Sequence, residues 1–598
     1  MSRTSEELVI PGRHSARRWL PYAISVVAGL VVIAATYVIV RPDPAGCVPL
    51  RVNSSSEKSS LIGKLAERYN KSRGRDVAGR CATVTVQGMN SGEAMNELAG
   101  GWAGSSPVPQ VWLPASSLWI GQLRQLNRDA LLPREDHPVI ASSPLVIALP
   151  KEKGLLLQER GTLGWGEILG APSQDGWATF GHPELGNFTF SKDNPALSTS
   201  GLAATIATYY AASGKEGGST LTLDDLEKDA VTAYVRGIEA NVSHYTDDVV
   251  DLLKRHAEAD LSLDGEAGVT DLNAIVMQES LVYQYNRGEM SPSSGSSGEP
   301  VRPRVPLIAL HPREGTYDLD HPYVVLPSTD QQQRQIADDF HEFLLEKPQQ
   351  EEFQLFGFRD HRRTPSAELS RWTHARGAPR DPFKEPAPEV VTKILEGWNK
   401  LSKKANILVA IDTSTSMNAQ SGNRSRFERA TEATRKALAL LGTEDKVALW
   451  SFSTETKQHP DAPFKPEVRL SRLDQGALTE KLDKLKADGP GTALYTTVRA
   501  AHRHMVENYA PDRINAVVVL TDGRNEYDAD NNLARLLRDV KLDPRKPVRI
   551  FCIAFDRDSD LGSLEEIAKT SGGKAFDARD PARIEDAFRA VVHSFGAR

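Results

Sequence analysis

Short, nearly continuous apolar runs in the last third of the chain constrain its fold more than any other feature. Three of these runs cover residues 406–411, 516–520 and 549–555, and a polar turn follows each of them. A strand that is buried on both faces has this composition, because neither face carries alternating polar side chains. Residues 446–452 form a further predicted strand, and stretches with helical spacing lie between the strands. The pattern predicts a doubly wound, Rossmann-like α/β domain over residues 405–598.

Five polar residues follow or separate these runs, in the order Asp412, Ser414, Ser416, Thr492 and Asp522. The series resembles that of a von Willebrand factor A (VWA) domain, whose metal-ion-dependent adhesion site (MIDAS) has the pattern D-x-S-x-S, then T, then D. The resemblance implies a VWA fold and assigns these five residues as metal ligands. The common glycine of the family is replaced here by a threonine at position 415, which stiffens the loop but removes no ligand.

The chemistry of this set suits a hard divalent cation. Mg²⁺ prefers about six oxygen ligands and keeps several waters. The two serines and Thr492 offer neutral oxygens, while Asp412 and Asp522 supply the charge. The expected ion is Mg²⁺, with Mn²⁺ or Ca²⁺ as alternatives. A site with so few protein anions stays positive, so it can accept an acidic side chain of a protein ligand.

Residues 48–360 alternate between strand-like and helix-like stretches, which predicts a sheet covered by helices. Hydroxyl-rich turns lie between these stretches. The order of these predicted strands and helices, together with the hydroxyl-rich turns, resembles that of a periplasmic-type extracellular solute-binding protein with two α/β lobes. In that family such turns line the cleft between the lobes. Helix N-termini and hydroxyls favour an anion, although serine is also a common helix cap. The serines expected to bind a small solute are Ser54, Ser55, Ser117, Ser143, Ser198 and Ser200.

The N-terminal residues predict a membrane anchor. Residues 19–40 form an uncharged run of 22 residues, and a helix of that length spans roughly 33 Å, enough for a hydrocarbon core of about 30 Å. Arginines shortly before it place residues 1–18 in the cytoplasm and everything after the anchor outside. The alternative is a cleaved signal peptide, whose apolar region is shorter. The expected location is the cell membrane, with a single span.

The cysteines fit an exported chain. Cys47 and Cys81 each directly precede a predicted strand, and an oxidising compartment would let them pair. Closing such a loop contributes on the order of 4 kcal/mol in the chain-entropy model. The alternative is two unrelated thiols. Cys552 lies inside an apolar run and is expected to be a buried core thiol.

Composition excludes other classes of protein. A net charge of −7, from 72 basic and 79 acidic residues, argues against a dedicated nucleic-acid binder. The chain has no phosphate-binding loop, no H-E-x-x-H and no C-x-x-C motif, so an enzyme acting on envelope polymers would lack a catalytic set.

The expected organisation is therefore a cytoplasmic tail (1–18), a transmembrane helix (19–40), a solute-binding-like module (48–360), a linker (361–388) and a VWA domain (405–598). This combination resembles actinobacterial membrane-anchored substrate-binding and VWA proteins. The expected function is metal-dependent recognition of a protein ligand at the cell surface. The alternative is the solute receptor of a transport system, with the VWA domain as a docking accessory.

Overall fold

The computed structural model describes residues 47–578 except 78, 103–106, 127, 134–136, 171–174, 247, 262–273, 292–299, 403, 422–423, 440, 456–462, 544 and 556–559. The predicted tail and membrane anchor lie outside the described residues. Within the part that is described, no helix is both long enough and apolar enough to cross a membrane.

The first lobe is built on a four-stranded sheet in the order β10-β3-β1-β2, in which only β10 is antiparallel. A disulfide joins Cys47 and Cys81 directly before β1 and β2, with their Cα atoms 4.5 Å apart. The strands are β1 (Val48–Ser54), β2 (Ala82–Gly88), β3 (Val111–Leu113) and β10 (Val324–Val325). The helices of this lobe are α2 (Ser56–Lys71), α3 (Ser91–Ala99), α4 (Leu118–Gln125), α13 (Gln331–Leu345) and α14 (Lys347–Leu355).

The second lobe has a mixed sheet in the order β6-β5-β7-β4-β8, and β9 pairs with β4. Its inner strand β4, between β7 and β8, is buried along its whole length, as expected of a strand covered on both faces. The strands are β4 (Ser143–Pro150), β5 (Phe190–Asp193), β6 (Val242–Thr246), β7 (Ala274–Gln278), β8 (Leu307–Leu310) and β9 (Asp318–Leu319). The helices are α5 (Lys151–Glu159), α6 (Trp165–Leu169), α8 (Thr199–Ala212), α9 (Leu223–Leu226), α10 (Asp229–Ala240), α11 (Val249–Leu261) and α12 (Glu279–Arg287).

The C-terminal domain has a six-stranded sheet in the order β15-β14-β11-β16-β17-β18, parallel except for the edge strand β15. Alternate residues of β11 pack to opposite sides: Leu408 and Ala410 face α19 to α21, while Ile407 and Val409 belong to the core that includes α17 and α18. The strands are β11 (Lys404–Asp412), β14 (Lys446–Phe452), β15 (Phe464–Arg472), β16 (Arg513–Thr521), β17 (Val548–Ala554) and β18 (Ala575–Asp577), with a small hairpin of β12 (Gln420–Ser421) and β13 (Arg424–Ser425). The helices are α17 (Arg426–Leu438), α18 (Gln475–Lys484), α19 (Leu494–Glu507), α20 (Leu533–Asp539) and α21 (Leu561–Thr570). Cys552 is a buried free thiol of β17.

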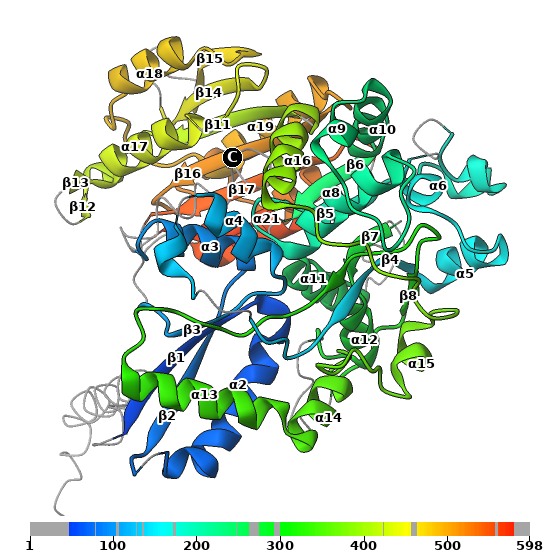
Figure 1. The fold of residues 1–598 in the computed structure, drawn as a ribbon. Helices are drawn as coiled ribbons and strands as arrows, with labels where there is room; N and C mark the ends of the chain where they lie inside the picture. Colours follow the sequence, from blue (N-terminus) through cyan, green and yellow to red (C-terminus); the bar gives the residue numbers. More distant parts are fainter. Residues whose placement is uncertain are drawn as a thin grey trace, which may run out of the picture.

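The segment between the two modules packs against both lobes. It contains α15 (Leu369–Thr373) and α16 (Pro388–Leu401), and Figure 1 shows α16 between the C-terminal sheet and α8. On the first lobe, the Gln122 side chain donates to the Pro388 carbonyl at 3.0 Å. On the second lobe, Trp398 donates to Glu239 at 3.2 Å and packs edge-on against Tyr245. This segment therefore crosses both lobes, and we call residues 361–401 the strap.

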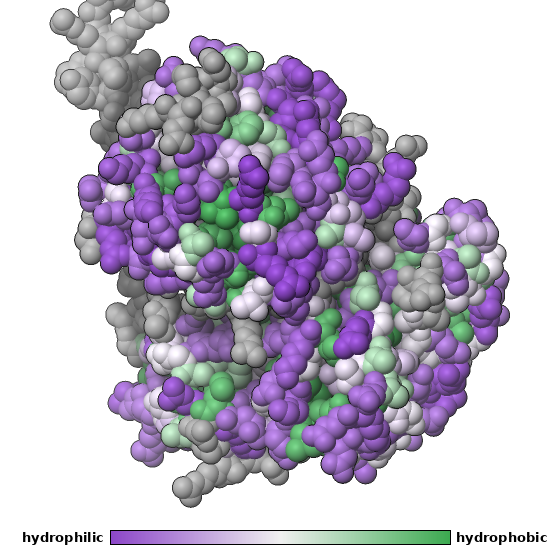
Figure 2. Space-filling view, turned by 90° about the horizontal axis from the view of Figure 1, so that it is seen from above, coloured by the Kyte–Doolittle hydropathy of each residue, from purple (hydrophilic) through white to green (hydrophobic). Residues whose placement is uncertain are grey.

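The C-terminal domain also touches the second lobe directly, through Lys569 of α21 and Glu258 of α11 at 3.0 Å. The face of the molecule seen from above in Figure 2 is mostly hydrophilic, with apolar residues visible between polar ones.

Candidate metal site and interlobe cavity

Three loops at the carboxyl end of the C-terminal sheet bring the five predicted metal ligands together. β11 ends at Asp412, and the loop after it carries Ser414 and Ser416. Thr492 directly precedes the turn into α19, and Asp522 directly follows β16. An isolated bridge between Ser414 and Gly489 joins the first loop to the second. Parallel strands produce this convergence because their carboxyl ends share one edge of the sheet.

The five side chains form one hydrogen-bonded cluster. The Oγ atoms of Ser414 and Ser416 are 2.9 Å apart, and Ser416 donates to Oδ1 of Asp522 at 2.8 Å. Thr492 Oγ1 lies 3.2 Å from both Asp412 Oδ2 and Ser414 Oγ. The structure thus places every residue of the predicted set in direct contact with at least one other.

Asp412 is the most deeply buried member of the cluster. Its side chain is inaccessible to solvent and accepts from the Ser414 amide at 2.9 Å and from the Thr521 hydroxyl at 2.6 Å. Burial raises the pKa of Asp412 to about 7, because removal from water penalises the charged carboxylate. A cation bound at this place would offset that penalty.

The backbone leaves little room for larger side chains around Thr492. A Cβ atom on Gly523 would lie 2.7 Å from Thr492 Oγ1, a distance that side chains avoid. Thr415 is not among the described non-glycine residues with positive φ, so the loop accommodates threonine where the resembled family commonly has glycine.

The donor set fits a hard divalent ion. It contains only oxygens, two from carboxylates and three from hydroxyls, which are the atoms that Mg²⁺ selects. Among the described residues, no group of three or more His, Cys, Asp or Glu side chains could hold a metal ion; the cluster owes most of its donors to hydroxyls instead.

Two contacts of this cluster were not predicted from the sequence. The first is the Thr521 hydroxyl, which donates to Asp412. Thr521 directly precedes Asp522, so its position in the sequence could have identified it as a member of the cluster. Arg426, the first residue of α17, lies with its Nη1 atom 2.8 Å from Asp522 Oδ2. No spacing rule connects two residues that are 96 positions apart.

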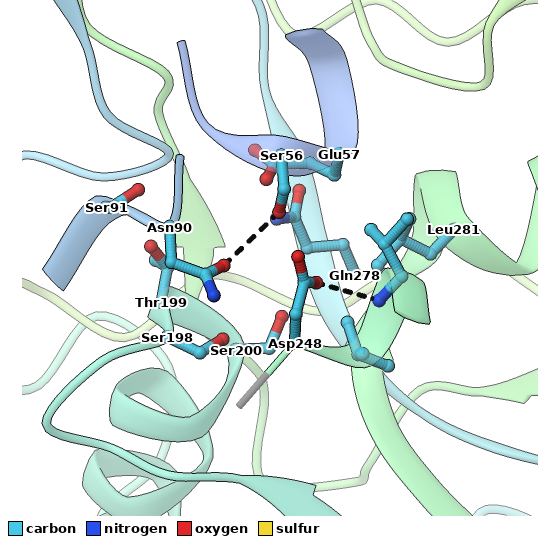
Figure 3. Close-up of a pocket in the computed structure, with 12 residues that line it drawn as sticks. Ser56, Glu57, Asn90, Ser91, Ser198, Thr199, Ser200, Asp248, Gln278 and Leu281 are labelled. Atoms are coloured by element: carbon cyan, nitrogen blue, oxygen red, sulfur yellow. Dashed lines mark hydrogen bonds between the residues drawn. The ribbon is translucent and has the colours of Figure 1, made fainter. Parts of the chain in front are cut away.

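A small polar cavity lies between the two lobes (Figure 3). Helix starts of both lobes meet there: α2 and α3 from the first, and α8, α11 and α12 from the second. The cavity volume is about 10 Å³, which is room for about one water molecule. Its walls are formed by Ser56, Glu57, Asn90, Ser91, Ser198, Thr199, Ser200, Asp248, Val249, Val250, Gln278 and Leu281.

Of the six serines predicted to bind a solute, Ser198 and Ser200 line this cavity. The other four are not among its lining residues. Ser54 donates to the backbone of Ser55, and Ser55 donates to Glu57 at 2.6 Å. Ser117 donates to Glu385 of the strap at 2.7 Å, and the Ser143 hydroxyl accepts from the Ser280 amide at 3.1 Å. Their role as ligands stays a prediction.

A carboxylate at the cavity gives it an acidic character. Asp248 accepts from the Val250 amide at 2.9 Å, and Figure 3 shows it among the lining side chains. Burial and the neighbouring Asp193 raise the pKa of Asp248 to about 7. Asp193 itself accepts from the Ser198 hydroxyl at 2.5 Å. Sequence reasoning missed Asp248, because an acidic helix start is also an ordinary cap.

Two lobes around a polar cavity, followed by a doubly wound domain with a cluster of oxygen donors, define a two-module binding protein. The model of the bacterial extracellular solute-binding protein family matches residues 50–359, and that of the von Willebrand factor type A domain matches residues 406–590. The chain belongs to the bacterial extracellular solute-binding protein family and carries a VWA domain after that module. Both predicted resemblances are confirmed. This pair of domains supports an extracellular binding protein, and neither match indicates a catalytic family.

Similar proteins include an uncharacterized protein of Mycobacterium tuberculosis (strain CDC 1551 / Oshkosh), 24% identical over 521 residues, which are 86% of this chain and 71% of the relative. Among solved structures, a von Willebrand factor type A protein from Catenulispora acidiphila is 24% identical with a TM-score of 0.27, covering 32% of this chain and 42% of that one. A periplasmic thiamin binding protein is 11% identical with a TM-score of 0.39, covering 60% and 97%.

Proposed function

We propose that this chain is a membrane-anchored, extracytoplasmic binding protein whose VWA domain uses a divalent metal to recognise a protein ligand. The observation that carries the proposal is the convergence of five oxygen-bearing residues, from three separate loops, into one cluster. Asp412 and Asp522 would supply charge, and the three hydroxyls would supply neutral donors. A bound Mg²⁺ would provide a hard positive centre that attracts a carboxylate of the partner.

The proposed location rests on the N-terminal sequence. The uncharged run at 19–40 and the arginines before it favour a single span with the N-terminus inside. The Cys47–Cys81 disulfide agrees with an oxidising compartment. A tag placed after residue 598 should be removed by protease added to intact spheroplasts, while a tag before Met1 should be protected. The reverse pattern would refute this orientation.

A second function, that of solute receptor in a transport system, is favoured by the family match over residues 50–359 and by a cavity with walls from both lobes. In that case the VWA domain would be a docking accessory. A small molecule that copurifies with the full chain, and that denaturation releases, would support this function.

Titration calorimetry of the full chain with Mg²⁺ and Mn²⁺ tests the metal site. Asp412→Ala should abolish binding and Asp522→Ala should weaken it severely, because hydroxyls cannot replace the lost charge. Asp512→Ala, which removes an exposed carboxylate before β16 at the other end of the sheet, is the matched control and should bind like the wild type. Mg²⁺ affinity of Asp412→Ala equal to that of the wild type would contradict the proposal.

Ligand recognition is tested separately. Affinity capture with the tagged chain should recover the same partner in Mg²⁺ from wild type and Asp512→Ala, and should lose it in EDTA or with Asp412→Ala. A partner that is retained in EDTA would show that recognition does not use the metal.

A further inference from the structure

The two oxygens of the Asp522 carboxylate have different partners. Oδ1 accepts from Ser416, inside the cluster of predicted ligands, at 2.8 Å. Oδ2 accepts from Nη1 of Arg426, also at 2.8 Å. The Asp522 side chain is fully buried, and that of Arg426 is 17% exposed. The ion pair is therefore largely shielded from water and strongly oriented.

Local structure fixes the start of the helix that carries Arg426. A capping box at the start of α17 joins Ser425 and Glu428: the Glu428 amide donates to Ser425 Oγ at 3.1 Å, and the Ser425 amide donates to the Glu428 carboxylate at 2.8 Å. The Arg426 amide donates to the Ala419 carbonyl at 3.0 Å, just after the loop of Ser416. The helix start is thus tied to the same loop that supplies two of the predicted ligands.

Among the described residues, no cationic side chain makes a comparable contact with Asp412, the second carboxylate of the cluster. Asp412 accepts hydrogen bonds from the Ser414 amide and from the hydroxyls of Thr492 and Thr521, which are uncharged groups. Of the two carboxylates, the Arg426 guanidinium contacts that of Asp522. This asymmetry distinguishes the two acidic residues of the site.

From this geometry we propose that Arg426 is a positioning residue that holds Asp522 Oδ2 and sets the metal affinity of the site. The proposal rests on the proposed function. With Oδ2 occupied, Asp522 presents only Oδ1 to the ion or to an ion-bound water. The guanidinium charge opposes a nearby divalent cation and lowers its affinity. The same charge leaves the loaded site more positive, which favours an acidic partner.

Calorimetry with Mg²⁺ alone, on the full chain, tests this role. Arg426→Gln should bind Mg²⁺ about tenfold more tightly than the wild type, because a positive charge a few ångströms from the ion is lost. A residue with a merely structural role would lower the affinity when replaced, so the direction of the change separates the two interpretations. Arg435→Gln, on the same helix and paired with Asp483 at 2.6 Å, is the control with the same change of charge and should leave the affinity unchanged.

A second variant keeps the charge. Arg426→Lys should bind Mg²⁺ within about twofold of the wild type, since the cation remains beside Asp522. Thermal melts without metal establish that each variant is folded, and Arg426→Met, which also removes the charge, replaces Arg426→Gln if that variant does not fold. Unchanged or weaker binding by Arg426→Gln, or a tenfold gain by Arg426→Lys, would overturn the role of Arg426. Absence of Mg²⁺ binding by the wild type would instead refute the proposed function.

Discussion

The interlobe cavity and the VWA metal cluster are both built from polar residues in turns, but the turns are arranged differently in the two regions. In both, hydroxyl-bearing residues lie in turns that precede helices. In the VWA cluster, all five residues lie at one edge of a single sheet, and three of them come from the end of β11 and the loop after it. In the cavity, the walls come from five helix starts on two lobes.

This difference predicts that the two regions will respond differently to changes elsewhere in the molecule. The geometry of the VWA cluster depends on the register of neighbouring parallel strands, which backbone hydrogen bonds define residue by residue. The geometry of the cavity depends on how the lobes and the strap pack together. A change that perturbs the packing of the lobes should therefore alter the cavity and leave the metal affinity of the VWA cluster unchanged.

The largest expected effect comes from the buried ion pair under the strap. Lys192 pairs with Glu239, and both side chains are at most 1% exposed. Lys192→Met leaves Glu239 buried without a cation, so we expect a loss of about 3–5 kcal/mol in the free energy of unfolding. Lys192→Met combined with Glu239→Gln should recover much of that loss, because no uncompensated charge remains. Urea unfolding measures both, and equal stability of the single and double variants would contradict this account.

Reduction of the disulfide is a second test of whether the solute-binding module and the VWA domain are independent. Cys47 and Cys81 lie in the first lobe, 34 residues apart, and the free Cys552 is buried in the VWA sheet. Reduction should destabilise the solute-binding module by about 2–4 kcal/mol. Alkylation of the native chain should label neither cysteine of the bridge until a reductant is added, and Cys552 only after unfolding. Metal affinity that falls on reduction would mean that the two modules are not independent.

The pH dependence of stability tests the acidic cavity. The pKa of Asp248 is about 7 in the folded chain and about 3.9 in an unfolded one. Because the folded-state pKa is raised, the stabilising contribution of Asp248 is full below about pH 4 and is lost as the pH rises through about 7. Asp248→Asn cannot ionise but keeps an acceptor for the Val250 amide. It should exceed the wild type in unfolding free energy by about 4 kcal/mol at pH 8 and match it near pH 4.

The control for this comparison is Asp229→Asn, an exposed acidic residue at the start of α10. It should show no such pH-dependent gain. Equal stability of Asp248→Asn and the wild type at pH 8 would mean that Asp248 stays well hydrated.

The smallest expected effect is that of Thr492→Ala on the metal site. Water can replace one neutral oxygen, so Mg²⁺ affinity should fall by less than about tenfold, with folding intact. Calorimetry measures the affinity, and Thr443→Ala, an exposed threonine before β14, is the control. A loss as complete as that expected for Asp412→Ala would show that Thr492 does more than donate a neutral oxygen.

The central strands of the VWA sheet were predictable because both of their faces are buried. Residues 446–452 form β14 as predicted, β11 and β16 cover the runs at 406–411 and 516–520, and β17 covers the run at 549–555 except for its last residue. The edge strand β15 was not predicted. Its residues are only partly buried or exposed, and a charged, alternating sequence resembles a surface loop as much as a strand.

What the sequence by itself determined is the identity of the two modules and the residues of the VWA cluster. Residue type and short spacing carry that information, since Asp412, Ser414 and Ser416 are alternate residues directly after an apolar run. Only the tertiary structure decided that Arg426 meets Asp522, that Asp248 lies at the cavity, and that Ser117 turns to the strap rather than the cavity. These contacts join residues far apart in the chain, and their formation depends on packing between elements, which no local pattern encodes.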